Sequence, residues 1–172
     1  MQQHVKRMLD VRQIPGEDVD VLAALEGLDP KWAFRRGDAV LVCGLEVLGS
    51  DAVAQLLAFA EEHNLARCIT VHSIKCTAQA RKDLTASPTV QFESFSENEM
   101  ALCPLDWAVQ SEYKLLSTPP AEPADNLARI WITDPVARYF GAAIGDVFEI
   151  VNRWGTLPPE TTHRVVTAPV GA

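Results

Sequence analysis

Three glutamates near the middle of the chain have the types and spacing that could support acid–base or metal chemistry. Glu97 and Glu99 form a pair of carboxylates, and Glu93 precedes them. A nuclease-type metal site would need an Asp and a Glu-x-Lys on adjacent strands. Phe95, not Lys, stands two residues after Glu93. The pair is therefore interpreted as part of a solvated surface, and no catalytic residue is predicted.

Cysteines and histidines are the other candidate nucleophiles and ligands. None of the four cysteines forms a C-x-x-C pair, and the four histidines have no zinc-type spacing, although His72 and Cys76 are four residues apart. The sequence predicts no metal site and no cofactor. The cysteines are instead expected to be small buried residues in a reducing compartment. They are Cys43, Cys68, Cys76 and Cys103.

Glycine motifs for phosphate binding are incomplete. Gly44 and Gly49 have roughly the Walker spacing, but Lys-Ser/Thr does not follow them. No G-x-G-x-x-G follows a strand pattern, and no G-x-S-x-G is present. No small-molecule substrate is expected on these grounds.

The helices and strands predicted around these candidate residues indicate an α/β domain in the first two thirds of the chain. Helices are predicted over 3–13, over 18–27 and over 51–64, the last capped by Ser50. Strands are predicted over 39–43, 68–72 and 90–95. Because strand, helix and strand follow in order, the first two strands are expected to be parallel. Residues 31–36 form a small basic-aromatic patch, either a nucleic-acid contact or a solvated face with Trp32 and Phe34 packed inward.

Arg129 to Gly141 predicts a strand, a cap and a short helix. Ile130 and Ile132 alternate with Arg129 and Trp131, as in a strand with one buried face. Thr133 or Asp134 can cap the helix, Pro135 suits its first position and Gly141 can end it. A turn at Gly145 and strands over 147–151 and 161–166 would complete an α+β module.

This module closely resembles the C-terminal assembly domain of the fifth common subunit of eukaryotic nuclear RNA polymerases, a family that includes an archaeal counterpart. The nine residues from Thr133 to Gly141, Thr-Asp-Pro-Val-Ala-Arg-Tyr-Phe-Gly, match the family pattern without a gap. His163 stands where the family usually has Tyr. Further positions agree in spacing: Gly145, Val147, Ile150, Arg153 and Arg164.

The resemblance implies a docking surface for other polymerase subunits, above all the largest one. Asp134 and Pro135 would fix the corner between strand and helix. Arg138, Tyr139 and Arg164 would contact either the large subunit or the module itself, with Arg138 as an ion-pair partner of Asp134 in the second case. The subunit-interface candidates are Thr133, Asp134, Pro135, Arg138, Tyr139, Gly141 and Arg164.

A weaker resemblance extends over the N-terminal half, where the family has an α/β jaw with a Rossmann-like, nuclease-like order of strands. Glu93 to Met100 matches the family's Glu-x-Phe-x-Glu-x-Glu-Leu segment. The family's Thr-Pro-Ser-Ala loop, which lies near downstream DNA, corresponds to residues 77–80, with Ala78 in place of Pro. The implied DNA-proximal residues are Thr77, Gln79, Arg81 and Lys82.

The segment 117–128 is the clearest linker, because Pro119, Pro120 and Pro123 exclude a continuous helix. The expected organisation is an N-terminal α/β jaw domain over 1–116, this Pro-rich linker, and a small α+β assembly domain over 129–172.

The net charge of the chain limits the kinds of partner that it can bind. The net charge is −8, and the 11 basic and 19 acidic residues of 1–125 account for all of it. Such a chain should contact duplex DNA only within a complex, because phosphate neutralisation dominates nucleic-acid binding. No apolar run approaches membrane-spanning length, and residues 1–10 have no hydrophobic run of a signal peptide.

The resemblance implies a non-catalytic subunit of a DNA-directed RNA polymerase, shared or class-specific. It would act in the nucleus, or in a cytoplasmic factory or virion if the source were a large DNA virus. The alternative is a free-standing α/β enzyme, or a transcription-regulatory cofactor, that reuses the assembly domain. The alternative would need a pocket with converging polar groups.

Overall fold

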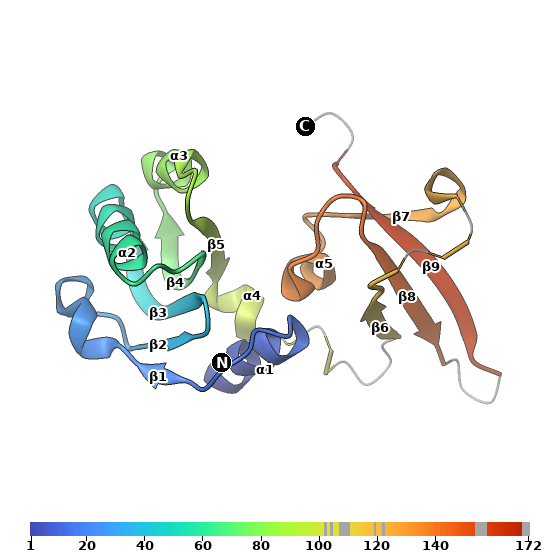
Figure 1. Cartoon of the computed structure of the whole chain (residues 1–172), viewed down its shortest axis with the longest axis horizontal. Helices are drawn as coiled ribbons and strands as arrows, with labels where there is room; N and C mark the ends of the chain where they lie inside the picture. Colours follow the sequence, from blue (N-terminus) through green and yellow to red (C-terminus); the bar gives the residue numbers. More distant parts are fainter. Residues whose placement is uncertain are drawn as a thin grey trace. The chain divides into compact units, whose positions relative to one another are not determined.

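The computed structural model describes residues 1–101, 103, 105–106, 111–118, 120–121, 123–153 and 158–169, without the side chains of residues 26, 74, 75, 81 and 85. The chain divides into two compact units, Met1–Ala101 and Leu102–Ala172 (Figure 1). None of the described helices is long and apolar enough to cross a membrane.

The N-terminal unit is built on a five-stranded sheet in the order β1-β2-β3-β4-β5. β1 pairs antiparallel with β2, and β2 with β3, whereas β3, β4 and β5 run parallel. The predicted parallel strand–helix–strand unit is confirmed. The strands are β1 (Val19–Asp20), β2 (Trp32–Arg36), β3 (Ala39–Leu48), β4 (Arg67–Cys76) and β5 (Gln91–Ser96).

Helices flank this sheet, with α2 and α3 on one side and α1 and α4 on the other (Figure 1). The helices are α1 (Gln2–Val11), the 3-10 helix η1 (Leu22–Leu28), α2 (Ser50–Glu62), α3 (Ala78–Ala86) and α4 (Glu97–Ala101). Two predictions were wrong here. The helix expected over 18–27 is β1 followed by η1, and Ser50 does not cap α2, because Gly49 occupies the N-cap position and no side chain caps it.

The core lies on both faces of β3 and β4. Val40 and Val42 belong to the cluster that contains the buried α2 residues Val53 and Leu56, while Leu41 alternates with them and is equally buried. A strand covered on both faces gives a continuous apolar run, as the sequence over 39–43 has. The two parallel crossovers therefore rest on hydrophobic burial, which provides most of the driving force for folding.

The C-terminal unit contains a four-stranded sheet in the order β6-β8-β9-β7. β7 pairs parallel with β9, and β8 pairs antiparallel with both β6 and β9. The predicted strand, short helix and two following strands are confirmed. The elements are β6 (Glu112–Leu115), the 3-10 helix η2 (Ala124–Asn126), β7 (Ala128–Trp131), α5 (Pro135–Phe140), β8 (Val147–Asn152) and β9 (Glu160–Thr167).

The division between the units differs from the expected boundary. The Pro-rich segment 117–128 does not separate them, because β6 precedes it and forms four register pairs with β8, from Glu112↔Val151 to Leu115↔Phe148. The segment connects two edge strands of one sheet, and its described part includes η2 and the first residue of β7. The second unit therefore begins near Leu102, upstream of the prolines.

Candidate functional site

A sharp corner joins β7 to α5. The Asp134 carboxylate accepts a hydrogen bond from the Val136 backbone N–H at 2.8 Å and so caps the helix, followed by Pro135 at its start. Gly141 ends the helix with φ of 65°, a left-handed conformation that favours glycine. The predicted cap, proline and glycine are confirmed in these structural positions.

Aromatic packing holds α5 against the sheet. Phe140 packs edge-on against Phe148 of β8, with ring centroids 5.2 Å apart and an interplanar angle of 87°. Tyr113 of β6 contacts the same Phe148 ring at 6.2 Å. Tyr139 is only 2% exposed, and its hydroxyl oxygen lies 3.6 Å from the Cys103 sulfur. This burial favours the intradomain role for Tyr139.

A surface hollow of about 370 Å³ lies at this corner. It brings together four of the seven predicted interface residues: Thr133, Asp134 and Pro135 from the corner after β7, and Arg164 from β9. Arg138, Tyr139 and Gly141 do not line it. Its lining consists of Arg129, Ile130, Trp131, Thr133, Asp134, Pro135 and Arg164.

The chemistry of this hollow, called the corner pocket below, is that of a contact surface. Trp131 is 55% exposed, and the side chains of Arg129 and Arg164 are also exposed. The Asp134 carboxylate is engaged in capping α5, so one indole and two guanidinium groups dominate the accessible lining. Trp and Arg are the residue types that most often carry binding energy at protein–protein interfaces.

Sequence reasoning missed Arg129, Ile130 and Trp131 as members of the site. The signal was present, because Arg129 and Trp131 occupy the outward positions of an alternating strand. A large aromatic residue at such a position indicates a contact surface more than a buried core. β7 is also an edge strand, so one of its backbone edges is not paired with a further strand of the sheet.

The predicted DNA-side residues lie at the start of α3, after β4. The Thr77 hydroxyl accepts the Ala80 N–H at 3.1 Å and so caps α3. The Gln79 side-chain amide donates to Asp83 at 2.8 Å, and Lys82 is exposed. Arg81 lies in α3, and its side chain is outside the described residues. The structure thus places these four positions at the N-cap and in the first five residues of α3, and none of them lines a described pocket.

The buried thiols are not poised for nucleophilic chemistry. Burial raises the pKa of Cys68 far above its ordinary value, and burial together with the charge of Glu97 does the same for the pKa of Cys43. Both thiols therefore stay protonated at neutral pH. Within the part of the chain that the structure describes, no group of three or more His, Cys, Asp or Glu could hold a metal ion.

The second unit is thus a small α+β module that exposes one tryptophan and two arginines around a hollow at the corner between β7 and α5. Residues 110–166 match the family described as RNA polymerase Rpb5, C-terminal domain. The match spans β6, β7, α5, β8 and nearly all of β9, so it covers the corner pocket completely. The resemblance expected from the motif at 133–141 is confirmed. A domain of this description implies an RNA polymerase subunit that associates with other subunits of that enzyme.

Proposed function

We propose that the chain is a non-catalytic subunit of a multisubunit DNA-directed RNA polymerase in the nucleus, and that its corner pocket docks on the largest subunit. The observation that carries the proposal is the coincidence of the family match with this pocket. Four residues expected at the interface converge there beside an exposed tryptophan. The active site of the enzyme would lie in the large subunits.

Trp131 supplies the main predicted contribution to docking. A buried tryptophan removes about 150–250 Å² from water, so covering the exposed half of Trp131 would bury about 100 Å². At about 25 cal/mol per Å², this burial is worth about 2.5 kcal/mol. Truncation to alanine should then weaken docking about 60-fold, because about 1.4 kcal/mol corresponds to tenfold.

In this proposal the N-terminal unit acts as a jaw beside downstream DNA. Gln79 and Lys82 are exposed on α3, at the position implied for the DNA-side loop. The acidic excess of residues 1–125 argues that the jaw approaches DNA only when other subunits hold it there. Any phosphate contact would therefore be local and would contribute little to the affinity of the free chain.

Affinity purification of the tagged chain from its own cells, with partners identified by mass, tests the proposal. The expected result is recovery of the two largest polymerase subunits in equal stoichiometry. Trp131→Ala should lose them, whereas Ile144→Ala should retain them. Ile144 is a matched control because it is 62% exposed in the same unit but does not line the corner pocket.

Recovery of the chain alone would contradict the proposal and would favour the free-standing enzyme or cofactor. Equal loss in both variants would indicate a general loss of exposed apolar surface and would argue against the corner pocket as the docking site. Class-specific subunits in the wild-type sample would show which polymerase the chain serves.

A further inference from the structure

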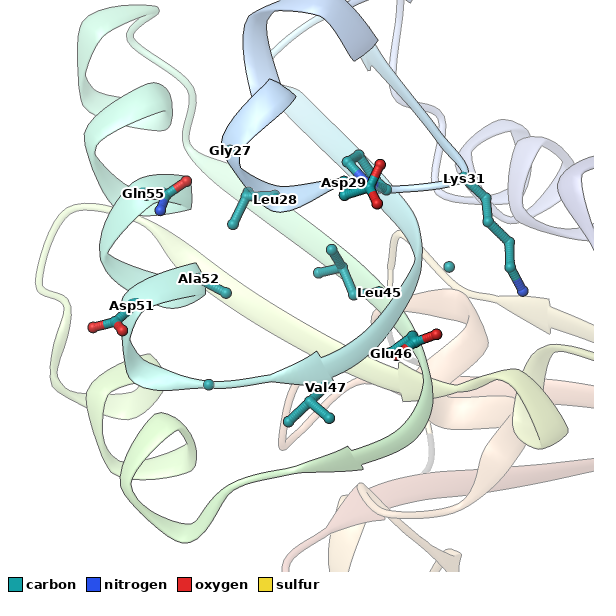
Figure 2. A pocket seen from close by; sticks show the side chains of 13 residues that line it. Gly27, Leu28, Asp29, Lys31, Leu45, Glu46, Val47, Asp51, Ala52 and Gln55 are labelled. Atoms are coloured by element: carbon teal, nitrogen blue, oxygen red, sulfur yellow. The ribbon is translucent and has the colours of Figure 1, made fainter.

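A second hollow, called the acidic groove below, lies within the N-terminal unit and plays no part in the function proposed above. Its volume is about 660 Å³, and it lies between the end of η1, the second half of β3 and the start of α2. Leu28 and Leu45 lie near its middle (Figure 2). Val47, another lining residue, is 44% exposed. These residues form an apolar floor, and its solvent-accessible part belongs to Leu28 and Val47, because Leu45 is only 3% exposed.

Three carboxylates surround this floor. Asp29 follows η1, Glu46 lies on β3 and Asp51 lies in the first turn of α2, and all three are exposed. Among the described residues, none of the three has a hydrogen-bond or ion-pair partner for its carboxylate. The lining thus carries three negative charges that the described part of the folded chain does not pair.

The one cation in the described lining is directed elsewhere. The Lys31 side chain extends away from the floor (Figure 2), and its ammonium nitrogen lies 3.3 Å from Oε1 of Glu97, which does not line the groove. Because Lys31 already pairs with Glu97, it offsets little of the charge of Asp29, Glu46 and Asp51.

The backbone holds the groove open before any ligand binds. Gly44 interrupts the β3–β4 register with φ of 81°, and a Cβ at Gly44 would lie 2.5 Å from the Lys31 side chain. The Lys31 amide donates to the Cys43 carbonyl at 2.9 Å, which fixes the strand entering the groove. Asp29 turns the chain in a left-handed conformation, with φ of 47°, and Pro30 beside it is buried. A preformed site loses less free energy to ordering when a ligand binds.

We propose that the acidic groove binds a basic segment of a partner protein. Lys or Arg side chains of that segment would meet Asp29, Glu46 and Asp51, and one apolar side chain would pack on Leu28 and Val47. Complementary charge gives such an interface its specificity and its association rate. A nucleic acid does not fit, because its phosphates would meet three unpaired carboxylates. The proposal is independent of docking through the corner pocket.

Fluorescence anisotropy with the full chain and the labelled peptide KRLKLRK tests the proposal. The triple variant Asp29→Asn, Glu46→Gln and Asp51→Asn should bind the peptide about tenfold more weakly, a loss of about 1.4 kcal/mol. The matched control is Glu17→Gln, Glu61→Gln and Glu62→Gln, which removes the same charge from exposed positions outside the groove. This control should keep the affinity of the wild type. The peptide KRSKSRK should bind the wild type more weakly, because it lacks the apolar anchors.

Equal weakening in the two triple variants would overturn the proposal, because binding would then reflect net charge alone. An absence of binding to the wild-type chain would also overturn it. If the groove variant does not fold, the single variant Glu46→Lys serves instead. It should bind KRLKLRK more weakly than Glu17→Lys does, because only Glu46 lines the groove, and equal weakening in the two variants would contradict the assignment.

Discussion

Removal of the Asp134 cap should loosen α5 locally. The Asp134 carboxylate accepts the Val136 N–H at 2.8 Å, and α5 is only six residues long, so this bond satisfies one of the few free amides at the helix start. Replacing a capping Asp with Ala costs about 1 kcal/mol, within a range of about 0.5–2 kcal/mol, whereas Asn caps about as well as Asp. Asp134→Ala should therefore destabilise the corner, and Asp134→Asn should not.

Native-state hydrogen exchange at individual amides measures this difference. A cost of about 1 kcal/mol corresponds to about fivefold faster exchange from the locally open state. The Val136 amide should respond most, because its acceptor is the deleted carboxylate. Gly141 offers a second probe, because its amide bonds to the Arg138 carbonyl at the other end of α5.

The reasoning would be refuted if Asp134→Ala and Asp134→Asn exchanged at the same rate at Val136. The reasoning would also be refuted if Asp134→Ala raised the exchange rates of β4 amides, in the other unit, as much as those of α5 amides. In that case the substitution would act globally and the cap would carry no local role.

Three further outcomes are expected. Gly141→Ala should lower the unfolding free energy by about 1 kcal/mol, because a backbone φ of 65° is strained for a residue with a Cβ. The denaturant midpoint should fall accordingly, and an unchanged midpoint would contradict the left-handed conformation of Gly141. Phe148→Ala should lower the unfolding free energy by about 3–5 kcal/mol, because the Phe148 side chain is 0% exposed and contacts two other rings. Urea unfolding measures this loss. A loss below about 1 kcal/mol would indicate that the surrounding side chains fill the space left by the ring. Burial raises the pKa of Asp18, but hydrogen bonds from Arg36 and Lys6 outweigh it, so the folded pKa lies below the ordinary value. The stabilisation of the folded chain by the Asp18 carboxylate is therefore present at neutral pH and disappears as pH falls through the folded pKa. The unfolding free energies of the wild type and Asp18→Asn, measured by urea titration, should differ at pH 7 and become equal in acid. A difference that stays constant with pH would refute this reasoning.

The corner at 129–141 could be predicted because its signals are local. A cap, a proline at the helix start and a glycine at its end act through the backbone of a few neighbouring residues, and the structure has all three in place. The parallel pair of β3 and β4 could be predicted for a similar reason, since its apolar runs are continuous. Burial on both faces leaves that pattern in the sequence.

Other features could not be predicted because they depend on distant partners. β6 contains Glu112 and Lys114 and is short, so its pairing with β8 is visible only once β8 is placed. The segment 32–36 has the composition of a basic-aromatic patch, but it is β2, whose register is set by residues 39–43. The position of Arg164 beside the corner also depends on a distant partner, because it comes from β9 through parallel pairing with β7, and it was expected there only through the family resemblance. Arg129 and Trp131 were missed for another reason, because their exposure on an alternating strand was a local signal that was not used.

The strand order of the two sheets has a consequence for the order in which they can form during synthesis. In the first sheet, neighbouring strands follow one another along the chain, so each new strand finds its partner already made. In the second sheet, β6 and β7 are made first but lie at opposite edges, and the central strands β8 and β9 come last. β6 has no partner until β8 leaves the ribosome, and β7 has none until β9 follows. The second sheet can therefore be completed only after translation of β9. Until their partners are made, β6 and β7 are unpaired, so they are the strands with the highest risk of pairing with a wrong segment.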